Sequence, residues 1–219
     1  MKILILGASG HAKVIIDLIE KAGQHEVVGL VAEDRTDDGT FCGYPVAGGI
    51  QDLARVCDDY KVECLVAGIG DNFSRSEVIR RASEIRPDSR FASASHPSAQ
   101  IARCVQIGEG TVVMAGAIVN SGTQIGRHCI INTGASVDHD SVLGDFVSIA
   151  PGAALGGNVR VGNCSAVSLG ASVIHGISIG EDTVIGAGAV VVRDIKSNVV
   201  AYGVPARVIR QRVRGQKYL

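Results

Sequence analysis

A histidine between two carboxylates is the arrangement in this chain best suited to acid–base chemistry. His139 stands between Asp138 and Asp140 in the stretch VDHD. A carboxylate that binds one imidazole nitrogen leaves the other free to accept a proton near neutral pH. The alternative is a solvated surface histidine, and composition alone does not decide between the two. The sequence therefore offers His139 as a candidate general base.

A second group of candidates lies in the first third of the chain. Gly7-Ala8-Ser9-Gly10 follows a short apolar run, and Glu33-Asp34 follows another. Backbone N–H groups of such a glycine turn, together with a helix N-terminus, can hold a diphosphate, and an acid after the second strand can bind ribose or base. A plain strand-to-helix turn and a pair of solvated acids are the alternatives. A dinucleotide redox cofactor is disfavoured, because the turn is not GxGxxG and no dehydrogenase-like catalytic set follows.

The elements that carry His139 are predicted by an unbroken six-residue repeat. An aliphatic residue stands at every sixth position from Ile101 to Val191. This period fits neither an α-helix nor a flat sheet, but it fits a triangular parallel β-helix in which three hexads make a coil. The inward aliphatic side chains should stack coil on coil, with a rise of about 4.8 Å.

Glycine adds an 18-residue period, as a three-sided coil requires. One column begins at Gly108, a second at Gly116, and a third, with Asp and Asn among its members, at Gly122. These residue types tolerate left-handed backbone, so all three columns are predicted to occupy such corners. His139 shares an outward column with His175, two coils further along.

The first 95 residues show a different pattern, in which apolar strands alternate with helices. Strands are expected at 2–6, 27–32 and 62–68, and helices at 12–22, 50–60 and 74–85. Such alternation predicts a small parallel α/β sheet, whose ligands bind at the carboxyl ends of the strands. Those ends are the 7–11 turn, Glu33-Asp34 and the 68–72 segment.

Composition narrows the class of protein. Among 219 residues the formal net charge is −1, which leaves no basic footprint for nucleic acid. No apolar stretch approaches a membrane span, and no signal peptide is recognisable. The six cysteines show no CxxC pair or metal-ligand spacing, which favours reduced, mostly buried thiols and a cytoplasmic location. The sequence contains no GxSxG motif, so it offers no sign of a covalent serine nucleophile.

The chain resembles the sugar acyltransferases of the hexapeptide-repeat superfamily that are related to sialic acid O-acetyltransferases. Within them it is most similar to the enzymes that N-acetylate nucleotide-linked 4-amino-4,6-dideoxy sugars, of the bacillosamine and perosamine type. The similarity covers almost the whole chain. The motifs that carry it are GASGHAKVI (7–15), GYPVAG (43–48), GIGDNFSR (68–75), HPSA (96–99), INTGASVDHDSVLGDFVSIAPGAALGG (131–157) and GVPARVI (203–209).

The resemblance implies a fold and an assembly. It implies a Rossmann-like α/β domain for nucleotide-sugar binding at 1–95, a left-handed parallel β-helix at 96–197, and a loop and helix at 198–219. It also implies a homotrimer, with acetyl-CoA held between the β-helices of neighbouring subunits.

The resemblance also assigns roles to single residues. His139 would be the general base and Asp140 the acid that orients it. Ser148 stands where the bacillosamine enzyme has a second histidine, and Glu33-Asp34 replaces a more usual Asp-Asp pair. Substrate-binding residues would be Gly10, His11, Glu33, Asp34, Gly70 and Asn72, and acetyl-CoA would lie against Ser148, Leu169 and Ala187.

The expected reaction is direct acetyl transfer from acetyl-CoA to a sugar 4-amine, without a metal. O-acetylation of a sialic acid or another sugar is one alternative. A non-catalytic nucleotide-sugar-binding β-helix is the other. The nucleotide, whether UDP, GDP or dTDP, stays open.

Overall fold

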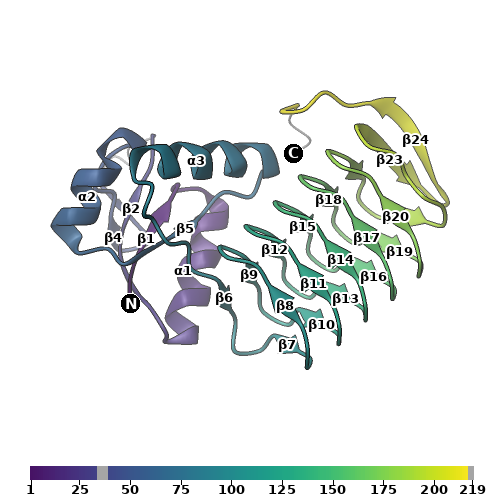
Figure 1. The fold of residues 1–219 in the computed structure, drawn as a ribbon, viewed down its shortest axis with the longest axis horizontal. Coiled ribbons are helices and arrows are strands. Elements are labelled where there is room, and N and C mark those ends of the chain that lie inside the picture. The colour runs from purple at the N-terminus through teal and green to yellow at the C-terminus, as the bar shows by residue number, and fades with distance from the viewer. Residues whose placement is uncertain (34–38, 217–219) are drawn as a thin grey trace. The chain divides into compact units, whose positions relative to one another are not determined.

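The chain forms two compact units in a computed structural model that describes residues 1–33 and 39–216. The first unit is Met1–Ser95 and the second is His96–Leu219. Figure 1 shows both units as a ribbon coloured from the N-terminus to the C-terminus. The predicted α/β domain and the predicted parallel β-helix are both confirmed.

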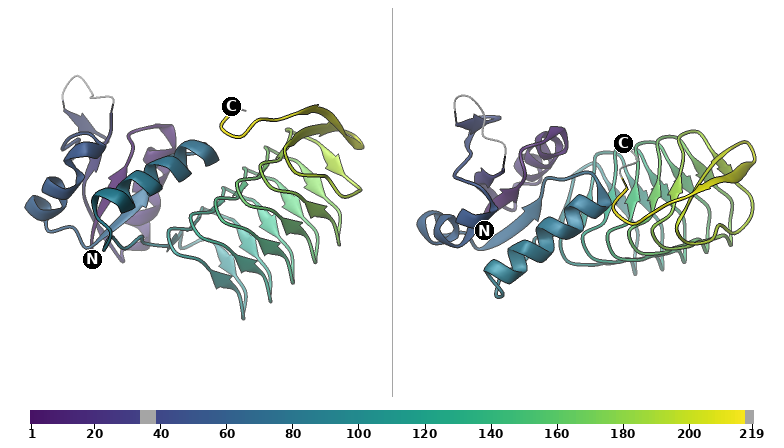
Figure 2. Two further views of the ribbon diagram at one scale, coloured as in Figure 1. Left: turned by 45° about the horizontal axis from the view of Figure 1, so that its top comes forward. Right: turned by 90° about the horizontal axis from the view of Figure 1, so that it is seen from above.

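The first unit is built on a three-stranded parallel sheet with the order β2-β1-β5. Its strands are β1 (Lys2–Leu6), β2 (Glu26–Val31) and β5 (Cys64–Ala67). Helix α1 (Gly10–Ala22) lies on one side of the sheet and α3 (Asn72–Ile85) on the other (Figure 2). The remaining elements are β3 (Thr40–Phe41), β4 (Tyr44–Pro45), a 3₁₀ turn (Ile50–Asp52), α2 (Leu53–Tyr60) and β6 (Ala94–Ser95).

Side-chain caps fix where the helices of this unit begin. The Ser9 hydroxyl accepts a hydrogen bond from the His11 N–H at 3.3 Å, and the Asp71 carboxylate accepts one from the Ser74 N–H at 2.8 Å. These contacts satisfy N–H groups that the first helical turn leaves free. Since both helices follow parallel strands directly, their N-termini and the strand ends gather at one edge of the sheet.

The second unit is a β-helix of two-residue strands that pair in parallel, coil on coil. Its three faces carry β22-β19-β16-β13-β10-β7, β20-β17-β14-β11-β8 and a third row from β9 to β21. The strands are Gln100–Ile101 (β7), Gln106–Ile107 (β8), Val112–Val113 (β9), Ile118–Val119 (β10), Gln124–Ile125 (β11), Ile130–Ile131 (β12), Ser136–Val137 (β13), Val142–Leu143 (β14), Ser148–Ile149 (β15), Ala154–Leu155 (β16), Arg160–Val161 (β17), Ala166–Val167 (β18), Ser172–Val173 (β19), Ser178–Ile179 (β20), Val184–Ile185 (β21) and Val190–Val191 (β22).

The predicted aliphatic column forms the core of the β-helix. Its hexad members are buried from Val113 to Val191. Ile107 is only partly buried and Ile101 is 38% exposed, so the prediction fails at the first coil. The reason is that β7 is the terminal strand of its face and pairs only with β10.

The glycine columns serve two different purposes. The column from Gly116 to Gly188 has left-handed backbone throughout, as predicted. The column that begins at Gly108 does not, and that part of the prediction is wrong. A Cβ on Gly126 would lie 2.6 Å from the carbonyl carbon and oxygen of Gly144. This column is therefore kept small by the close approach of successive coils.

The C-terminal segment corrects a second expectation. In place of a helix, β23 (Val199–Gly203) and β24 (Ala206–Gln211) form an antiparallel hairpin, and β23 pairs with β21. The β-branched residues Val199 and Val200 suit a strand, and the open edge of β21 supplies a pairing partner.

The helices within residues 1–33 and 39–216 are all too short or too polar to span a lipid bilayer.

The two kinds of corner should respond differently to a methyl group. Gly126→Ala forces a Cβ against backbone of the next coil and should cost about 2–3 kcal/mol, as overpacking does. Gly134→Ala meets no atom within 4 Å but keeps a φ of +64°, and should cost about 1 kcal/mol. Urea unfolding of both variants measures the difference. Equal losses would contradict the close-approach explanation.

Candidate active site

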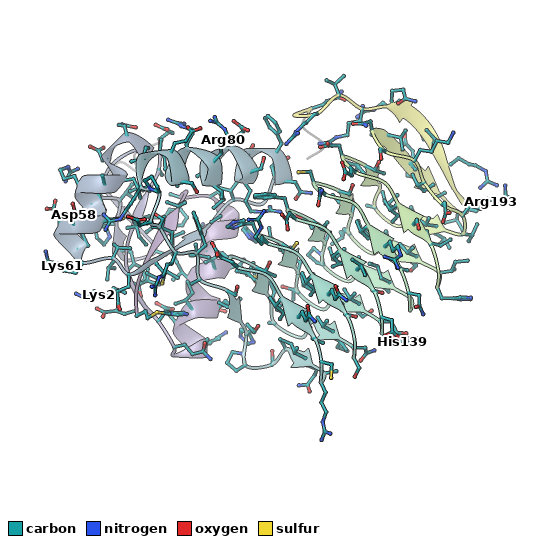
Figure 3. All side chains as sticks on the ribbon, in the orientation of Figure 1. Lys2, Asp58, Lys61, Arg80, His139 and Arg193 are labelled. Carbon is teal, nitrogen blue, oxygen red and sulfur yellow. The ribbon has the colours of Figure 1, made fainter. Side chains whose placement is uncertain are left out.

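His139 projects from the corner that joins β13 to β14, where Figure 3 labels it on the outer surface of the β-helix. Its Nδ1 lies 2.9 Å from Oδ2 of Asp140. An ionised carboxylate can only accept, so Nδ1–H donates to Asp140 and Nε2 is left as the basic nitrogen. Asp140 has left-handed backbone, with φ at +57°. The predicted pair is therefore together, half exposed to solvent.

Two negative charges act on this imidazole. The hydrogen bond to Asp140 raises the pKa of His139, and the charge of Asp138 raises it further. The Asp138 carboxylate accepts the N–H of His139 at 2.8 Å and an Asn120 amide N–H at 2.8 Å. These two bonds lower the pKa of Asp138, so this carboxylate stays ionised when the imidazole titrates.

The next coil leaves room for the ring. A Cβ on Gly157 would lie 2.6 Å from Nε2 of His139, so only glycine at this position allows the observed rotamer. The Gly157 carbonyl accepts the Gly176 N–H, and the His139 carbonyl accepts the Asn158 N–H. The corner is thus held by backbone pairing on both sides.

The residues expected to line acetyl-CoA lie beside another face. Ser148 belongs to β15, while Leu169 and Ala187 follow β18 and β21 of the same sheet. Leu169 is 57% exposed, Ala187 is exposed, and the Gly188 N–H donates to the Leu169 carbonyl at 2.9 Å. His139 stands at a different corner of the triangle, between β13 and β14. One chain therefore does not bring the candidate base and the candidate cofactor residues together.

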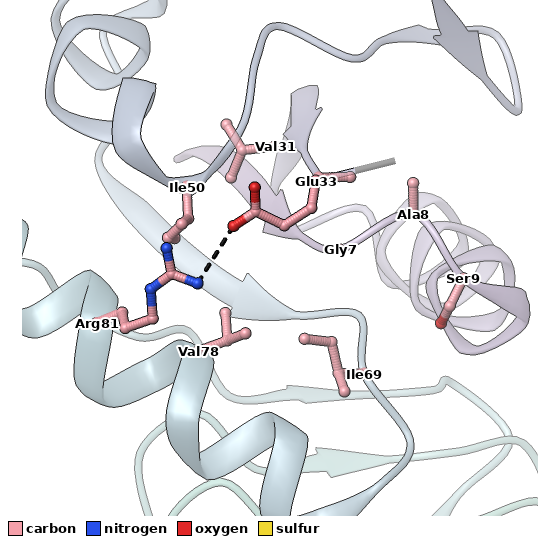
Figure 4. Close-up of a pocket in the computed structure, with 10 residues that line it drawn as sticks. Gly7, Ala8, Ser9, Val31, Glu33, Ile50, Ile69, Val78 and Arg81 are labelled. Carbon is pink, nitrogen blue, oxygen red and sulfur yellow. Dashed lines mark hydrogen bonds and ion pairs between the residues drawn. The ribbon is translucent and has the colours of Figure 1, made fainter. Parts of the chain in front are cut away.

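The first unit holds a cavity of about 190 Å³ at the carboxyl ends of its strands (Figure 4). The glycine turn lines one side with Gly7, and helix α3 contributes Val78 and Arg81. Glu33 follows β2 and pairs with Arg81 at 3.2 Å, an arginine that the sequence analysis did not single out. Asp34 lies outside the described residues. The cavity combines apolar walls with one carboxylate and one guanidinium, which suits a nucleobase or ribose.

Other predicted substrate residues lie next to this cavity without lining it. A Cβ on Gly70 would lie 3.8 Å from the Cβ of His11, which places these two residues side by side. Burial lowers the pKa of His11 to about 4, and Arg75 contributes to the shift. His11 is therefore neutral at physiological pH. Gly10 is the first residue of α1 and is exposed.

A buried arginine explains the shape of the third strand end. Arg75 is 1% exposed, and its guanidinium donates to the carbonyls of Ile69 and Gly70 at 3.1 and 2.8 Å. It also donates to the side chain of Asn72 at 2.9 Å, and Asn72 is equally buried. In this contact Asn72 helps to hold the buried guanidinium of Arg75. Arg75 stands in the GIGDNFSR motif, but nothing in its residue type signals that it is buried.

The described residues give no sign of a metal centre, since no three His, Cys, Asp or Glu side chains gather to hold one. All six cysteines are free. Four of them are buried and two, Cys42 and Cys104, are exposed, in agreement with the expectation of mostly buried thiols.

Comparison with known families identifies both parts of the chain. Residues 2–82 match the model of the PglD N-terminal domain, and residues 104–139 match the bacterial transferase hexapeptide model of six repeats. UDP-N-acetylbacillosamine N-acetyltransferase of Bacillus subtilis is 39% identical over 117 residues. That alignment covers 52% of this chain and 51% of the relative, so the chain spans about half the length of this curated relative.

Solved structures match over nearly the full length. A histidine-to-asparagine variant of perosamine N-acetyltransferase from Caulobacter crescentus, in complex with CoA and GDP-perosamine, is 39% identical. The match covers 96% of this chain and 98% of that one, with a TM-score of 0.90. The acetyltransferase domain of PglB from Neisseria gonorrhoeae, in complex with acetyl coenzyme A, is 34% identical with a TM-score of 0.88, over 95% of this chain and 98% of that one.

The chain combines an N-terminal domain of the PglD type with a hexapeptide β-helix, and the structural match covers 96% of its length. The chain therefore belongs to the family of hexapeptide-repeat sugar acyltransferases that includes perosamine N-acetyltransferase and the acetyltransferase domain of PglB.

Proposed function

We propose that this protein transfers the acetyl group of acetyl-CoA to the 4-amino group of a nucleotide-linked 4-amino-4,6-dideoxy sugar. The observation that carries the proposal is the His139–Asp140 pair, in which the hydrogen bond from Nδ1–H to Asp140 leaves Nε2 as the basic nitrogen. Relatives that match almost the whole chain bind CoA with GDP-perosamine, or acetyl coenzyme A. Since the reaction consumes acetyl-CoA, we also propose a cytoplasmic location.

In the proposed mechanism the neutral amine attacks the thioester carbonyl carbon. The C–N bond forms, and Nε2 of His139 takes a proton from the nitrogen as positive charge develops there. Backbone N–H groups of the coil stabilise the oxyanion. The C–S bond then breaks, and the proton held on His139 passes to the departing CoA thiolate. Asp140 keeps Nδ1 protonated throughout and stabilises the imidazolium.

His139 and the candidate acetyl-CoA residues lie on different corners of the β-helix, which supports an active site shared between two subunits. The base stands between β13 and β14, while Leu169 and Ala187 stand on a corner at the other edge of the β13 face. A neighbouring copy can set its own cofactor corner against His139, whereas a single chain cannot. Cyclic repetition of one such contact closes a ring, and we propose the homotrimer of the family resemblance.

The cavity of the first unit is the proposed site for the nucleotide. Its Glu33–Arg81 pair offers an acceptor beside a donor, which matches the edge of uracil, thymine or guanine. A thermal-shift panel of UDP-, GDP- and dTDP-sugars would identify the nucleotide. A ligand at 100 times its Kd should stabilise the fold by about 2.7 kcal/mol.

O-acetylation of a sugar hydroxyl is the rival activity, since the same base could serve it. Acceptors that carry a 4-amine should react, and matched acceptors with only hydroxyl groups should not. Preference for the hydroxyl acceptors would favour the rival, and no acetyl-CoA turnover with any amine acceptor would favour a non-catalytic role.

Replacement of the base should abolish most activity. His139→Ala should lower kcat by at least about 10²-fold, because the proton acceptor is removed. The Kd of the nucleotide sugar, measured by calorimetry, should not change. His175→Ala is the matched control in the same column, and it should retain most of its activity. An active His139→Ala enzyme would refute the mechanism.

Replacement of the cavity carboxylate should act on binding alone. Glu33→Gln removes a charged acceptor and should raise KM for the nucleotide sugar about tenfold, with kcat and the KM for acetyl-CoA unchanged. Glu84→Gln is the matched control, since Glu84 is an exposed carboxylate that also pairs with an arginine of α3. A rise in the KM for acetyl-CoA instead would show that the cavity has been assigned to the wrong substrate.

The assembly makes its own prediction. Multi-angle light scattering should give about three times the mass of the chain, and specific activity should fall when dilution dissociates the trimer. A monomer with full specific activity at every concentration would overturn the shared-site proposal.

A further inference from the structure

We propose that Asp138, anchored by Asn120 of the preceding coil, is a positioning residue that holds the His139 corner and places a second fixed negative charge beside the imidazole. The inference rests on the proposed function, in which His139 is the base. It concerns residues that neither the sequence motif nor the family assignment gave a role.

The anchor is a pair of contacts from one coil to the next. Strands β10 and β13 pair in register, with Ile118 opposite Ser136, so Asn120 lies directly beside Asp138. The Asn120 amide donates to Oδ1 of Asp138 at 2.8 Å. The Thr123 hydroxyl donates to the Asp138 backbone carbonyl at 3.0 Å. Both ends of Asp138 are thus held by side chains that precede the base by about one coil.

The anchored carboxylate then holds the base. Oδ1 of Asp138 also accepts the backbone N–H of His139 at 2.8 Å. One oxygen therefore joins Asn120 to the peptide from which the imidazole projects. Because the side chain of His139 is 54% exposed, its orientation depends on few contacts: the hydrogen bond to Asp140, the space at Gly157 and the backbone bond to Asp138.

The Asp138 carboxylate also places a negative charge beside the imidazole. Both hydrogen bonds to the Asp138 carboxylate go to Oδ1, and no described residue donates to Oδ2. Asp138 and Asp140 lie on the same corner as the imidazole, and Gly157 of the following coil lies close to Nε2, while the Ser121 carbonyl of the preceding coil accepts the Asp140 N–H. Among the described residues the charges that act on the ring are those of Asp138 and Asp140, and both stabilise the imidazolium formed when the amine gives up its proton.

A purely structural acid would behave differently from a positioning residue. If Asp138 only capped the corner, its amide analogue would serve as well, since Asn also accepts through Oδ1. If its charge also acts on His139, then Asp138→Asn must shift the titration of the imidazole. Asn120→Ala makes the complementary change, because it keeps the charge and removes the anchor.

The test is an NMR titration of the His139 imidazole, assigned with His139→Ala, combined with steady-state kinetics. In Asp138→Asn the imidazole should titrate at lower pH than in the wild type, and the acid limb of the pH–kcat profile should move in the same direction. The sign follows because loss of a nearby negative charge disfavours the protonated ring. Glu109→Gln removes an exposed carboxylate elsewhere on the β-helix and should change neither readout.

In Asn120→Ala the titration should stay at the wild-type pH, while kcat falls about tenfold and the KM for acetyl-CoA is unchanged. Wild-type titration in Asp138→Asn would overturn the charge role, and wild-type kcat in Asn120→Ala would overturn the anchor. An active His139→Ala enzyme would instead overturn the proposed function, and the titration would still report whether Asp138 acts on the imidazole.

Discussion

The parallel pairing of short strands from coil to coil is the constraint on which the β-helix and its candidate site depend. Each two-residue strand contributes its N–H and carbonyl groups to the coils on either side, as the Ser136 N–H of β13 does with the carbonyl of Ala153. The buried aliphatic column makes any other register costly, because a shift would turn apolar side chains toward solvent. Residues 18 apart in the sequence are therefore direct neighbours, and a side chain in one coil can support chemistry in the next.

The two units hold their candidate sites by different physical means. On the β-helix His139 is half exposed, and its orientation depends on backbone geometry, a left-handed corner and the space at Gly157. In the α/β unit the loop after β5 is held from inside by the fully buried Arg75. The outer corner leaves the imidazole of His139 accessible from solvent, whereas Arg75 shapes a wall of the cavity without lining it.

How far the sequence predicts this structure depends on whether a residue's role follows from its type. The aliphatic hexads and the alternation of strands and helices in the first unit do follow, and they predict both folds. The burial of Arg75 does not, because an arginine is buried only when particular carbonyl groups converge on it. For the glycine column that begins at Gly108 the residue type predicts left-handed corners, whereas the structure requires glycine there because successive coils approach closely. The segment 206–211 is predicted as part of a helix but forms strand β24, because β23 pairs with the open edge of β21 and its own free edge then pairs with β24.

The equal spacing of the coils also determines which insertions and deletions this chain can survive. Loss or gain of one residue between Ile101 and Val191 would put every later hexad out of phase, so that inward positions become outward ones along the rest of the β-helix. Removal of 18 residues would take out one whole coil and let its neighbours pair across the gap. Length in this domain can therefore change in whole coils, and the domain can lengthen or shorten while the corner at His139 keeps its local surroundings.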